Sequence, residues 1–196
     1  MMVIGVTGGM ASGKSTVARM FAGRGIAHVD ADKMVHHLMQ HDRNMIEEIA
    51  AAFPAAKNVN GLDRAALAKT ITEHPGMLSI LESIIHPRVR DTEERAIAIA
   101  RRNGLRAVIL DIPLLFETDA QHLCDVVVVA YAPLPHRKRR AFTRAGMTDQ
   151  KWTRLLDRQL SDHVRNHAAD VVISTTIGKA ATRRRVKQLM KQWKLT

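Results

Sequence analysis

Residues 8–15 have the sequence Gly-Gly-Met-Ala-Ser-Gly-Lys-Ser, which matches the phosphate-loop pattern G-x-x-x-x-G-K-[ST] at every fixed position. Residues 3–7 form a short apolar run rich in β-branched side chains and predict a buried strand before the loop. Residues 15–21 place apolar side chains at helical spacing and predict a helix after it. Strand, glycine-rich loop and helix in this order are the context that a phosphate-binding loop requires.

The residue types in this loop predict how it binds a nucleotide. Glycines let backbone N–H groups close around phosphate oxygens, and the positive end of the helix dipole adds attraction. We expect Lys14 to reach the β- and γ-phosphates of ATP and the Ser15 hydroxyl to ligate Mg²⁺. The predicted nucleotide-binding residues are Gly8, Gly9, Ala11, Ser12, Gly13, Lys14, Ser15 and Thr16.

The rest of the chain predicts the fold around the loop. Further short apolar runs predict strands at residues 26–29, 107–110, 126–130 and 171–173. Strands that alternate with helices favour a parallel sheet with right-handed crossovers. We therefore expect an α/β protein with the three-layer fold of P-loop NTPases and a parallel five-stranded sheet. Residues 33–102 show helical patterns without a convincing strand, with two helices, 77–85 and 89–100, on either side of Pro87.

The composition limits the kind of protein and of partner. A net charge of +11 and a pI near 10.5 require an anionic partner, which is a nucleic acid, a membrane surface or a highly phosphorylated small molecule. Aromatic residues make up 4% of the chain and none lies within the basic runs, which weakens the nucleic-acid interpretation. Cys124 is the only cysteine, which excludes an intramolecular disulfide and favours a reducing compartment.

Apolar runs are too short for targeting or membrane insertion. The first one ends at Gly8, before the length of a signal peptide, and none approaches the ~18 residues of a membrane span. We therefore expect a cytoplasmic protein.

Two aspartates follow the second predicted strand. In a small kinase this position lies across the γ-phosphate from the loop, where a carboxylate can accept the proton of an attacking hydroxyl. We assign this role to Asp32 and expect Asp30 to cap the next helix, although a capping role for either residue is a serious alternative. Asp111 ends a predicted strand, where a carboxylate would hold Mg²⁺ through water.

Basic residues gather in two segments. Arg140 and Arg144 are one helical turn apart, so both project from one face and can clamp a polyphosphate on a closing lid, with Gly146 as its hinge. A plain basic helix is the alternative. The second segment, residues 183–187, is most simply a solvated helix face. No aspartate is followed three residues later by glycine, which excludes a GTPase and leaves small kinases and other ATPases.

These motifs together resemble the dephospho-coenzyme A kinase family along nearly the whole chain. The phosphate loop and Asp30-Ala31-Asp32 are similar to the family's loop and acidic motif, whose second aspartate is the proposed base. Residues 111–117 resemble its proline-leucine-leucine segment. The remaining matches are Ile85-His86-Pro87 with Arg90 in the substrate-domain signature, and Arg140, Arg144 and Gln159 in the lid pattern.

The resemblance implies a single kinase domain over residues 1–196, with a core of 1–32 and 103–196, a helical substrate-binding insertion at about 33–102 and a lid at about 134–160. It implies transfer of the ATP γ-phosphate to the ribose 3′-hydroxyl of dephospho-CoA, the last step of coenzyme A synthesis. The partners are then dephospho-CoA and ATP, with no nucleic acid or membrane, in a monomer or weak homo-oligomer. The implied substrate-binding residues are Asp32, His86, Pro87, Arg90, Leu114 and Glu117.

The chain departs from the family pattern at two places, and two other functions stay open. Ala11 stands where the family usually has glycine, and it would cost ~1–2 kcal/mol if the backbone there needs a positive φ. Residues 174–176, Ser-Thr-Thr, stand where an asparagine often lies near adenine. The alternatives are a kinase for another small hydroxyl substrate, such as a nucleoside, and a basic nucleic-acid-binding ATPase suggested by the +11 charge.

Overall fold

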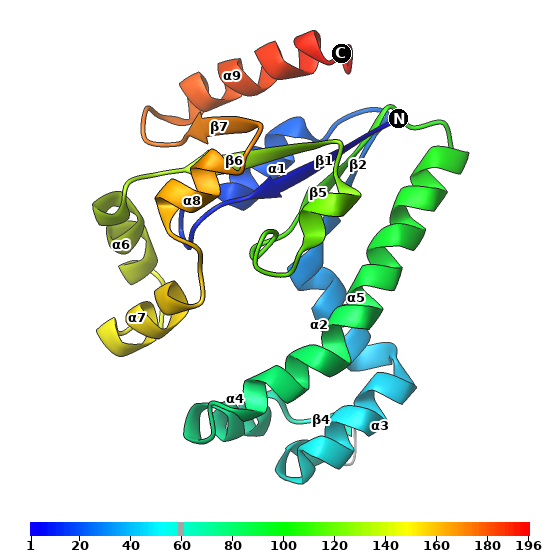
Figure 1. Cartoon of the computed structure of the whole chain (residues 1–196), viewed down its shortest axis with the longest axis vertical. Coiled ribbons are helices and arrows are strands. Elements are labelled where there is room, and N and C mark those ends of the chain that lie inside the picture. Colours follow the sequence, from blue (N-terminus) through cyan, green and yellow to red (C-terminus); the bar gives the residue numbers. More distant parts are fainter. Residues whose placement is uncertain (59–60) are drawn as a thin grey trace. The chain divides into compact units, whose positions relative to one another are not determined.

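The computed structural model describes residues 1–58 and 61–196 (Figure 1). The chain divides into two compact units, one formed by Met1–Asp30 with Ala96–Thr196 and the other by Ala31–Arg95. The first unit contains the phosphate loop. Each unit has its own apolar core, so each is described separately.

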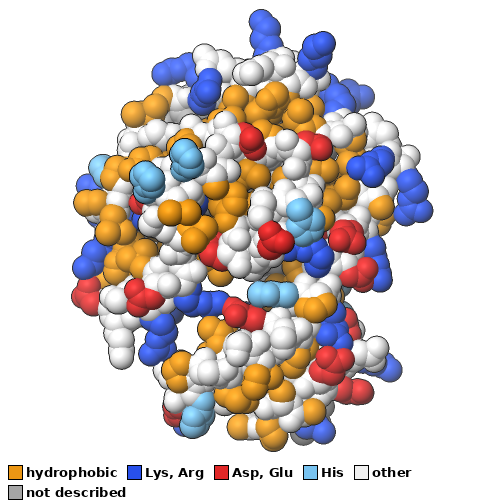
Figure 2. All heavy atoms as spheres, viewed as in Figure 1, with side chains coloured by type: hydrophobic (Ala, Val, Ile, Leu, Met, Phe, Trp, Pro, Cys, Tyr) orange, Lys and Arg blue, Asp and Glu red, His pale blue; other side chains and the backbone are white. Residues whose placement is uncertain are grey.

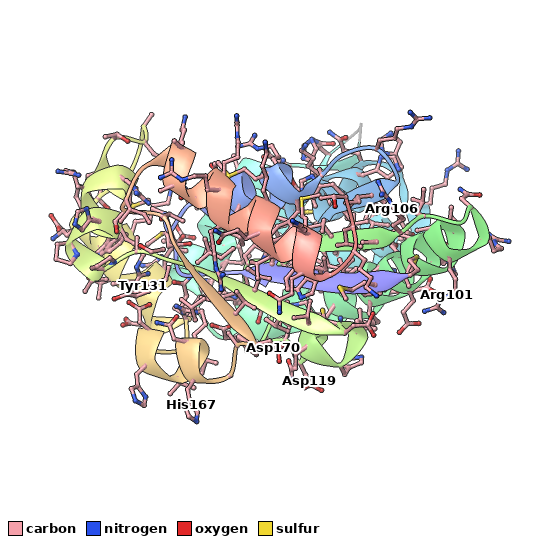
Figure 3. All side chains as sticks on the ribbon, turned by 90° about the horizontal axis from the view of Figure 1, so that it is seen from above. Arg101, Arg106, Asp119, Tyr131, His167 and Asp170 are labelled. Atoms are coloured by element: carbon pink, nitrogen blue, oxygen red, sulfur yellow. The ribbon has the colours of Figure 1, made fainter. Side chains whose placement is uncertain are left out.

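A five-stranded parallel sheet is the centre of the first unit, as the sequence predicted, with strand order β2-β5-β1-β6-β7. The strands are β1 (Met2–Thr7), β2 (Ile26–Asp30), β5 (Ala107–Asp111), β6 (Val126–Tyr131) and β7 (Val171–Ser174). In Figure 3, Tyr131 at the carboxyl end of β6 and Arg106 just before β5 lie at opposite ends of the sheet. The phosphate loop leaves β1 at the edge where all five strands end, which is where parallel sheets bind ligands.

Two helices cover one face of this sheet. They are α1 (Lys14–Phe21) and α9 (Lys179–Gln192), which contact each other. Val17 and Phe21 of α1 and Val186 and Leu189 of α9 lie at helical spacing and are buried with inward-facing strand residues. Each such fully buried side chain contributes about 1.5–3 kcal/mol. This core fixes the first turn of α1, and therefore Lys14, against the sheet.

The other face of the central strand is closely covered. Gly5 lies between Ile4 and Val6, which point into the first core, so Gly5 faces the opposite side. A Cβ added to Gly5 would lie 2.6 Å from Cys124 Sγ and 2.7 Å from Leu115 Cδ1. The single cysteine is therefore a packing residue here.

Three further helices follow β6 in the first unit. They are α6 (Leu134–Phe142), α7 (Asp149–Asp157) and α8 (Asp162–His167). Thr148 and Ser161 cap α7 and α8, because their hydroxyls accept hydrogen bonds from Lys151 N and Val164 N, both at 3.2 Å. Helix α8 packs against β6, on the side of the strands away from α1 (Figure 3).

The second unit is mostly helical, as predicted. Its elements, in part shared with the first unit, are α2 (Ala31–His41), α3 (Arg43–Ala52), a 3₁₀ turn (Pro54–Ala56), β3 (Lys57–Asn58), β4 (Gly61–Leu62), α4 (Arg64–Glu73) and α5 (Met77–Arg102). Met45, Ile49, Phe53 and Leu67 form the centre of its core. The antiparallel pair β3–β4 corrects the expectation that no strand occurs here. Strands of two residues are too short to produce an alternating pattern.

Helix α5 corrects a second expectation, because it runs through Pro87 without ending. Proline lacks the N–H that would bond to the carbonyl of Ser83, and its ring crowds that carbonyl. The Arg88 guanidinium donates to the carbonyl of Ile84, the residue after Ser83, at 2.8 Å. Ile85 and Leu81 of the same helix are buried in the core of this unit, so packing outweighs the local penalty.

Positive side chains are prominent on the molecular surface. In Figure 2, Lys and Arg side chains stand along the upper edge of the face shown, where Figure 1 places α9. The cationic residues of 183–187 are exposed, so the second basic segment is the solvated helix face that the sequence indicated. Within residues 1–58 and 61–196, no helix combines the length and apolar character needed to cross a bilayer.

Replacement of Pro87 tests the strain in α5. Pro87→Ala restores a helical hydrogen bond at an exposed position and should raise the unfolding free energy by about 1–3 kcal/mol. Thermal denaturation should show this as an increase in Tm of several degrees. Pro75→Ala, the same change just before α5, is the matched control and should not raise Tm. Equal effects of the two substitutions would contradict strain at Pro87.

Candidate active site

The loop between β1 and α1 has the backbone of a phosphate-binding loop. Gly13, which precedes Lys14, has a φ of 97°, a conformation that favours glycine. Ala11 has a φ of 60°, so the position where glycine was expected does lie in the left-handed region. The turn is closed by the N–H of Ser12, which donates to the carbonyl of Gly9 at 2.9 Å.

Lys14 is held at the sheet edge by Asp111. Its Nζ donates to Asp111 Oδ1, and the Asp111 side chain is completely buried at the end of β5. The other carboxylate oxygen lies 3.5 Å from Nε2 of His28, a residue of β2. Neither of these two buried atoms has a hydrogen-bond partner in the described structure. Asp111 therefore keeps one acceptor oxygen unused beside the lysine.

The side chains that Mg²⁺ would need lie in the same loop region. Ser15 is exposed in the first turn of α1, directly after Lys14. Asp111 provides the unused carboxylate oxygen. Hydroxyl and carboxylate oxygens are the donors that Mg²⁺ prefers. The residues present therefore fit this ion, and the assignment of Ser15 and Asp111 to it stays a prediction.

Arg140 ties the loop to the segment after β7. Its Nη1 donates to the carbonyl of Ser12 at 3.2 Å and to Thr175 Oγ1 at 3.0 Å, and its Nη2 donates to the carbonyl of Thr175 at 2.8 Å. Thr175 Oγ1 also donates to the carbonyl of Ser12. Thus one arginine from α6 joins two segments of chain more than 160 residues apart in sequence.

A cavity of about 270 Å³ opens beside the loop. It is lined by residues of α1, α6 and the β7–α9 connection, including Gly13, Thr16, Arg140, Arg144, Thr175 and Lys179. Arg144 and Lys179 are exposed, and neither takes part in an ion pair given for the described residues. The walls combine loop backbone, apolar side chains and cations, a composition suited to an anionic ligand with an apolar ring.

A buried ionic cluster lies behind the loop. Arg137 and Arg165 are 4% and 2% exposed, and both donate to Asp162. Glu117 Oε1 lies 3.9 Å from Arg165 and accepts the N–H of Leu160 at 2.8 Å. Burial lowers the pKa of Arg165 below its usual value, whereas Glu117 and Asp162 act in the opposite direction.

The predicted substrate residues fall in both units. Leu114 and Glu117 follow β5 in the first unit and are half-buried. The second unit contains Asp32, His86, Pro87 and Arg90. Asp32 is exposed in the first turn of α2, directly after Asp30 at the end of β2, and Arg90 pairs with Glu93 at 3.0 Å on α5. Their roles toward substrate stay predictions.

Sequence reasoning missed several residues that shape this site. Thr175 was named only within the segment 174–176, although its place after a strand at the ligand-binding edge of the sheet was a usable signal for a structural role. Arg165 had none, since a charged residue in a polar stretch gives no indication that it is buried. Asp162 and His28 are half-buried, and nothing local in the sequence indicates that they lie beside Arg137 and Asp111. Gln159 was noted only as part of a pattern, and its Oε1 accepts the N–H of Met10 in the loop at 2.9 Å.

The sheet order, the loop after its central strand and the Lys14–Asp111 pair define a P-loop kinase fold. Shikimate kinase from Acinetobacter baumannii shares this fold, with a TM-score of 0.50 and 18% identity over 98% of this chain and 92% of that one. The family model described as dephospho-CoA kinase matches residues 2–179. The chain belongs to the dephospho-CoA kinase family.

Named relatives are similar over nearly their whole length. The chain is 38% identical to dephospho-CoA kinase from Agrobacterium fabrum over 193 residues, covering 98% of each chain. It is 40% identical to dephospho-CoA kinase from Gluconobacter oxydans over 196 residues, covering 97% and 96%. Among solved structures, TT1252 from Thermus thermophilus has a TM-score of 0.83 and 30% identity, covering 100% of this chain and 98% of that one.

Replacement of Ala11 tests the strain in the loop. Ala11→Gly removes the left-handed penalty of ~1–2 kcal/mol, partly offset by the greater entropy of the unfolded chain, so we expect a net gain of about 0.5–1 kcal/mol. Chemical denaturation measures this gain. Ala22→Gly, the same change at a φ of −63°, is the control and should lower stability. A loss of stability in both variants would contradict strain at Ala11.

Proposed function

We propose that the protein transfers the γ-phosphate of ATP to the ribose 3′-hydroxyl of dephospho-CoA and releases CoA and ADP. The observation that carries this proposal is the loop of residues 8–15, with Lys14 held at the sheet edge by buried Asp111, in a chain of this family. The positive charge of +11 supports it, because both substrates are polyanions. The single cysteine supports a cytoplasmic location.

In this proposal the loop and the adjoining cavity bind ATP. The amides of residues 8–16 surround the phosphates, and Lys14 leaves Asp111 to contact the β- and γ-phosphates. The nucleoside part enters the cavity of about 270 Å³, which Thr175 and Thr182 line together with the apolar Val17 and Met20. Thr175 belongs to the segment 174–176, where the family often has an asparagine near adenine.

Magnesium would bind at Ser15, with Asp111 in its outer shell, and would neutralise charge on the β- and γ-phosphate oxygens. The unused Oδ2 of Asp111 supports this assignment. When Lys14 moves toward phosphate, Asp111 has both carboxylate oxygens available to hold water around the ion.

Asp32 is proposed to orient the attacking hydroxyl. Its side chain is exposed in the first turn of α2. Because phosphoryl transfer has a loose transition state, the carboxylate aligns the hydroxyl and takes its proton late. Asp30 directly precedes α2, which supports its predicted role as the cap of that helix.

Residues 134–160 are proposed to act as a lid, with Arg140 and Arg144 as its cations. Gly146, between α6 and α7, has a φ of 73° and can serve as a hinge. Arg144 lines the cavity and is exposed, so it is available to a phosphate. Arg140 already bonds to loop and Thr175 carbonyls, so its contribution includes holding the nucleotide pocket together.

The remaining substrate contacts are proposed from the family resemblance. His86 and Pro87 are exposed on α5 and Arg90 is half-buried there, so one helix presents all three. Leu114 and Glu117 would contact dephospho-CoA from the segment after β5.

A direct assay tests the substrate. The protein should form CoA when supplied with ATP, Mg²⁺ and dephospho-CoA, and Lys14→Ala should lower the rate by about 10²-fold or more because the γ-phosphate loses its charged donor. Chromatographic detection of CoA measures this. Phosphorylation of nucleosides instead of dephospho-CoA would refute the substrate assignment. ATP hydrolysis stimulated only by nucleic acid would favour a nucleic-acid-binding ATPase.

Replacement of Asp32 tests the proposed base. Asp32→Asn should lower kcat by about 10²- to 10⁴-fold, because the amide cannot accept the hydroxyl proton, and should leave the KM for ATP within a few-fold. Steady-state kinetics measure both constants. Asp119→Asn is the matched control, since Asp119 is exposed at a φ of 54° that asparagine also adopts readily. Near-normal kcat for Asp32→Asn would remove this residue from the mechanism.

A further inference from the structure

Arg137 lies within the basic run of α6, yet its side chain is only 4% exposed. Its Nε donates to the carbonyl of Ala132 at 3.1 Å, and its Nη2 donates to both carboxylate oxygens of Asp162 at 2.9 Å and 2.8 Å. Contacts on two sides of a planar group fix both its position and its orientation. The guanidinium of Arg137 is therefore a rigid element of the core and not a surface cation.

The third nitrogen of this group, Nη1, faces the phosphate loop. It is buried and has no hydrogen-bond partner within the described part of the chain. A Cβ added to Gly9 would lie 2.2 Å from this nitrogen and 2.8 Å from Cζ of Arg137. Gly9 does not have a positive φ, unlike Gly8 and Gly13, so its own backbone would accept any residue. The same Cβ would lie 3.1 Å from Nη1 of Arg165, so the two buried arginines, and Arg137 most closely, leave no room for a side chain at position 9.

The charge of Arg137 is compensated locally. Asp162 pairs with Arg137 and with Arg165, and Glu117 lies 3.9 Å from Arg165, so two cations face two carboxylates. In such a balanced buried group, little net field reaches a phosphate bound on the loop. The effect of Arg137 on the loop must therefore come from its volume and position.

The position of Gly9 controls the rest of the loop. Its carbonyl accepts the N–H of Ser12 at 2.9 Å, and this bond closes the turn that contains strained Ala11. The next residue, Met10, is held through its N–H by Gln159 at 2.9 Å. A shift of Gly9 would therefore displace the amides on which phosphate binding depends, and a misplacement of about 1 Å can lower activity by about 10²-fold.

We propose that Arg137 is a positioning residue for the phosphate loop, which sets the place of Gly9 by direct contact and thereby the spacing of the phosphate-binding amides. This inference rests on the proposed function where it is tested through the KM for ATP. The contact itself is independent of nucleotide, so it can be tested in the free protein as well.

A double-mutant cycle over Gly9→Ala and Arg137→Gln tests the proposal. Gly9→Ala alone should raise the KM for ATP by about tenfold or more and lower Tm, because the new methyl group cannot fit against a fixed guanidinium. In the Arg137→Gln background, the shorter side chain leaves room, so the same change should raise the KM by no more than about threefold. Gly9→Ala is also combined with Arg137→Lys, which keeps the positive charge beside Asp162 but lacks the Nη1 atom.

Gly23→Ala is the matched control, because a Cβ at Gly23 meets no atom within 4 Å. It should change neither the KM for ATP nor Tm. An equal penalty for Gly9→Ala with and without either Arg137 substitution would overturn the proposal. If neither Arg137 variant folds, the Gly9→Ala variant tests the proposal by itself. An unchanged KM for ATP in that variant would then overturn the proposal.

Failure of the proposed function gives a different result. A wild-type protein that does not bind ATP refutes that function. The double-mutant cycle measured by Tm without nucleotide still tests the contact between Arg137 and Gly9. Rescue of Tm in that cycle together with rescue of the KM for ATP supports a positioning role, since a purely structural contact would change Tm alone.

Discussion

The ion pair between Lys14 and Asp111 joins the fold to the site. Asp111 is fully buried, and an uncompensated carboxylate in that place would be strongly destabilising. The pair forms only because β1 and β5 are parallel neighbours, with Val6 opposite Asp111, so that the loop after β1 begins beside the end of β5. A single buried carboxylate thus requires the strand order, the loop and the first turn of α1 to be correct together. In the proposed function the same lysine also contacts phosphate, so the interaction that holds the free site would be one that the nucleotide replaces.

The phosphate loop is held from behind by side chains from distant parts of the chain. Arg140 bonds to the carbonyl of Ser12, Gln159 accepts the N–H of Met10, and Arg137 lies against Gly9. Each contact reaches the loop from the region between β6 and β7. A binding loop fixed before the ligand arrives loses little entropy on binding, which is the usual advantage of preorganised sites. These contacts also explain how the loop tolerates Ala11 at a φ of 60°, because the surrounding bonds outweigh its strain.

Sequence reasoning succeeded where the signal is local. The five strands and the loop were predicted because a short apolar run and a glycine pattern each lie within a few residues. The possible strain at Ala11 came instead from the family resemblance, since the family usually has glycine at that position. Sequence reasoning failed at Pro87, where packing of Leu81 and Ile85 outweighs a local helix breaker. It also assigned no role to Arg137, which lies in the same basic run as Arg140 and Arg144. Only the tertiary structure brings Asp162, 25 residues further on, to a place where it can compensate that charge.

The arginines and lysines differ in what they offer a ligand, and the net charge of +11 conceals this difference. Arg137 and Arg165 are buried with carboxylates, and Arg140 is occupied by backbone carbonyls, so these three shape the site more than they attract anions. Arg144 and Lys179 line the cavity and are exposed, so they keep their charge available. Because a compensated charge produces little field at a distance, attraction of a polyanionic substrate depends on the exposed cations near the cavity. The buried cations determine instead whether the loop that receives the phosphates is already in the right place.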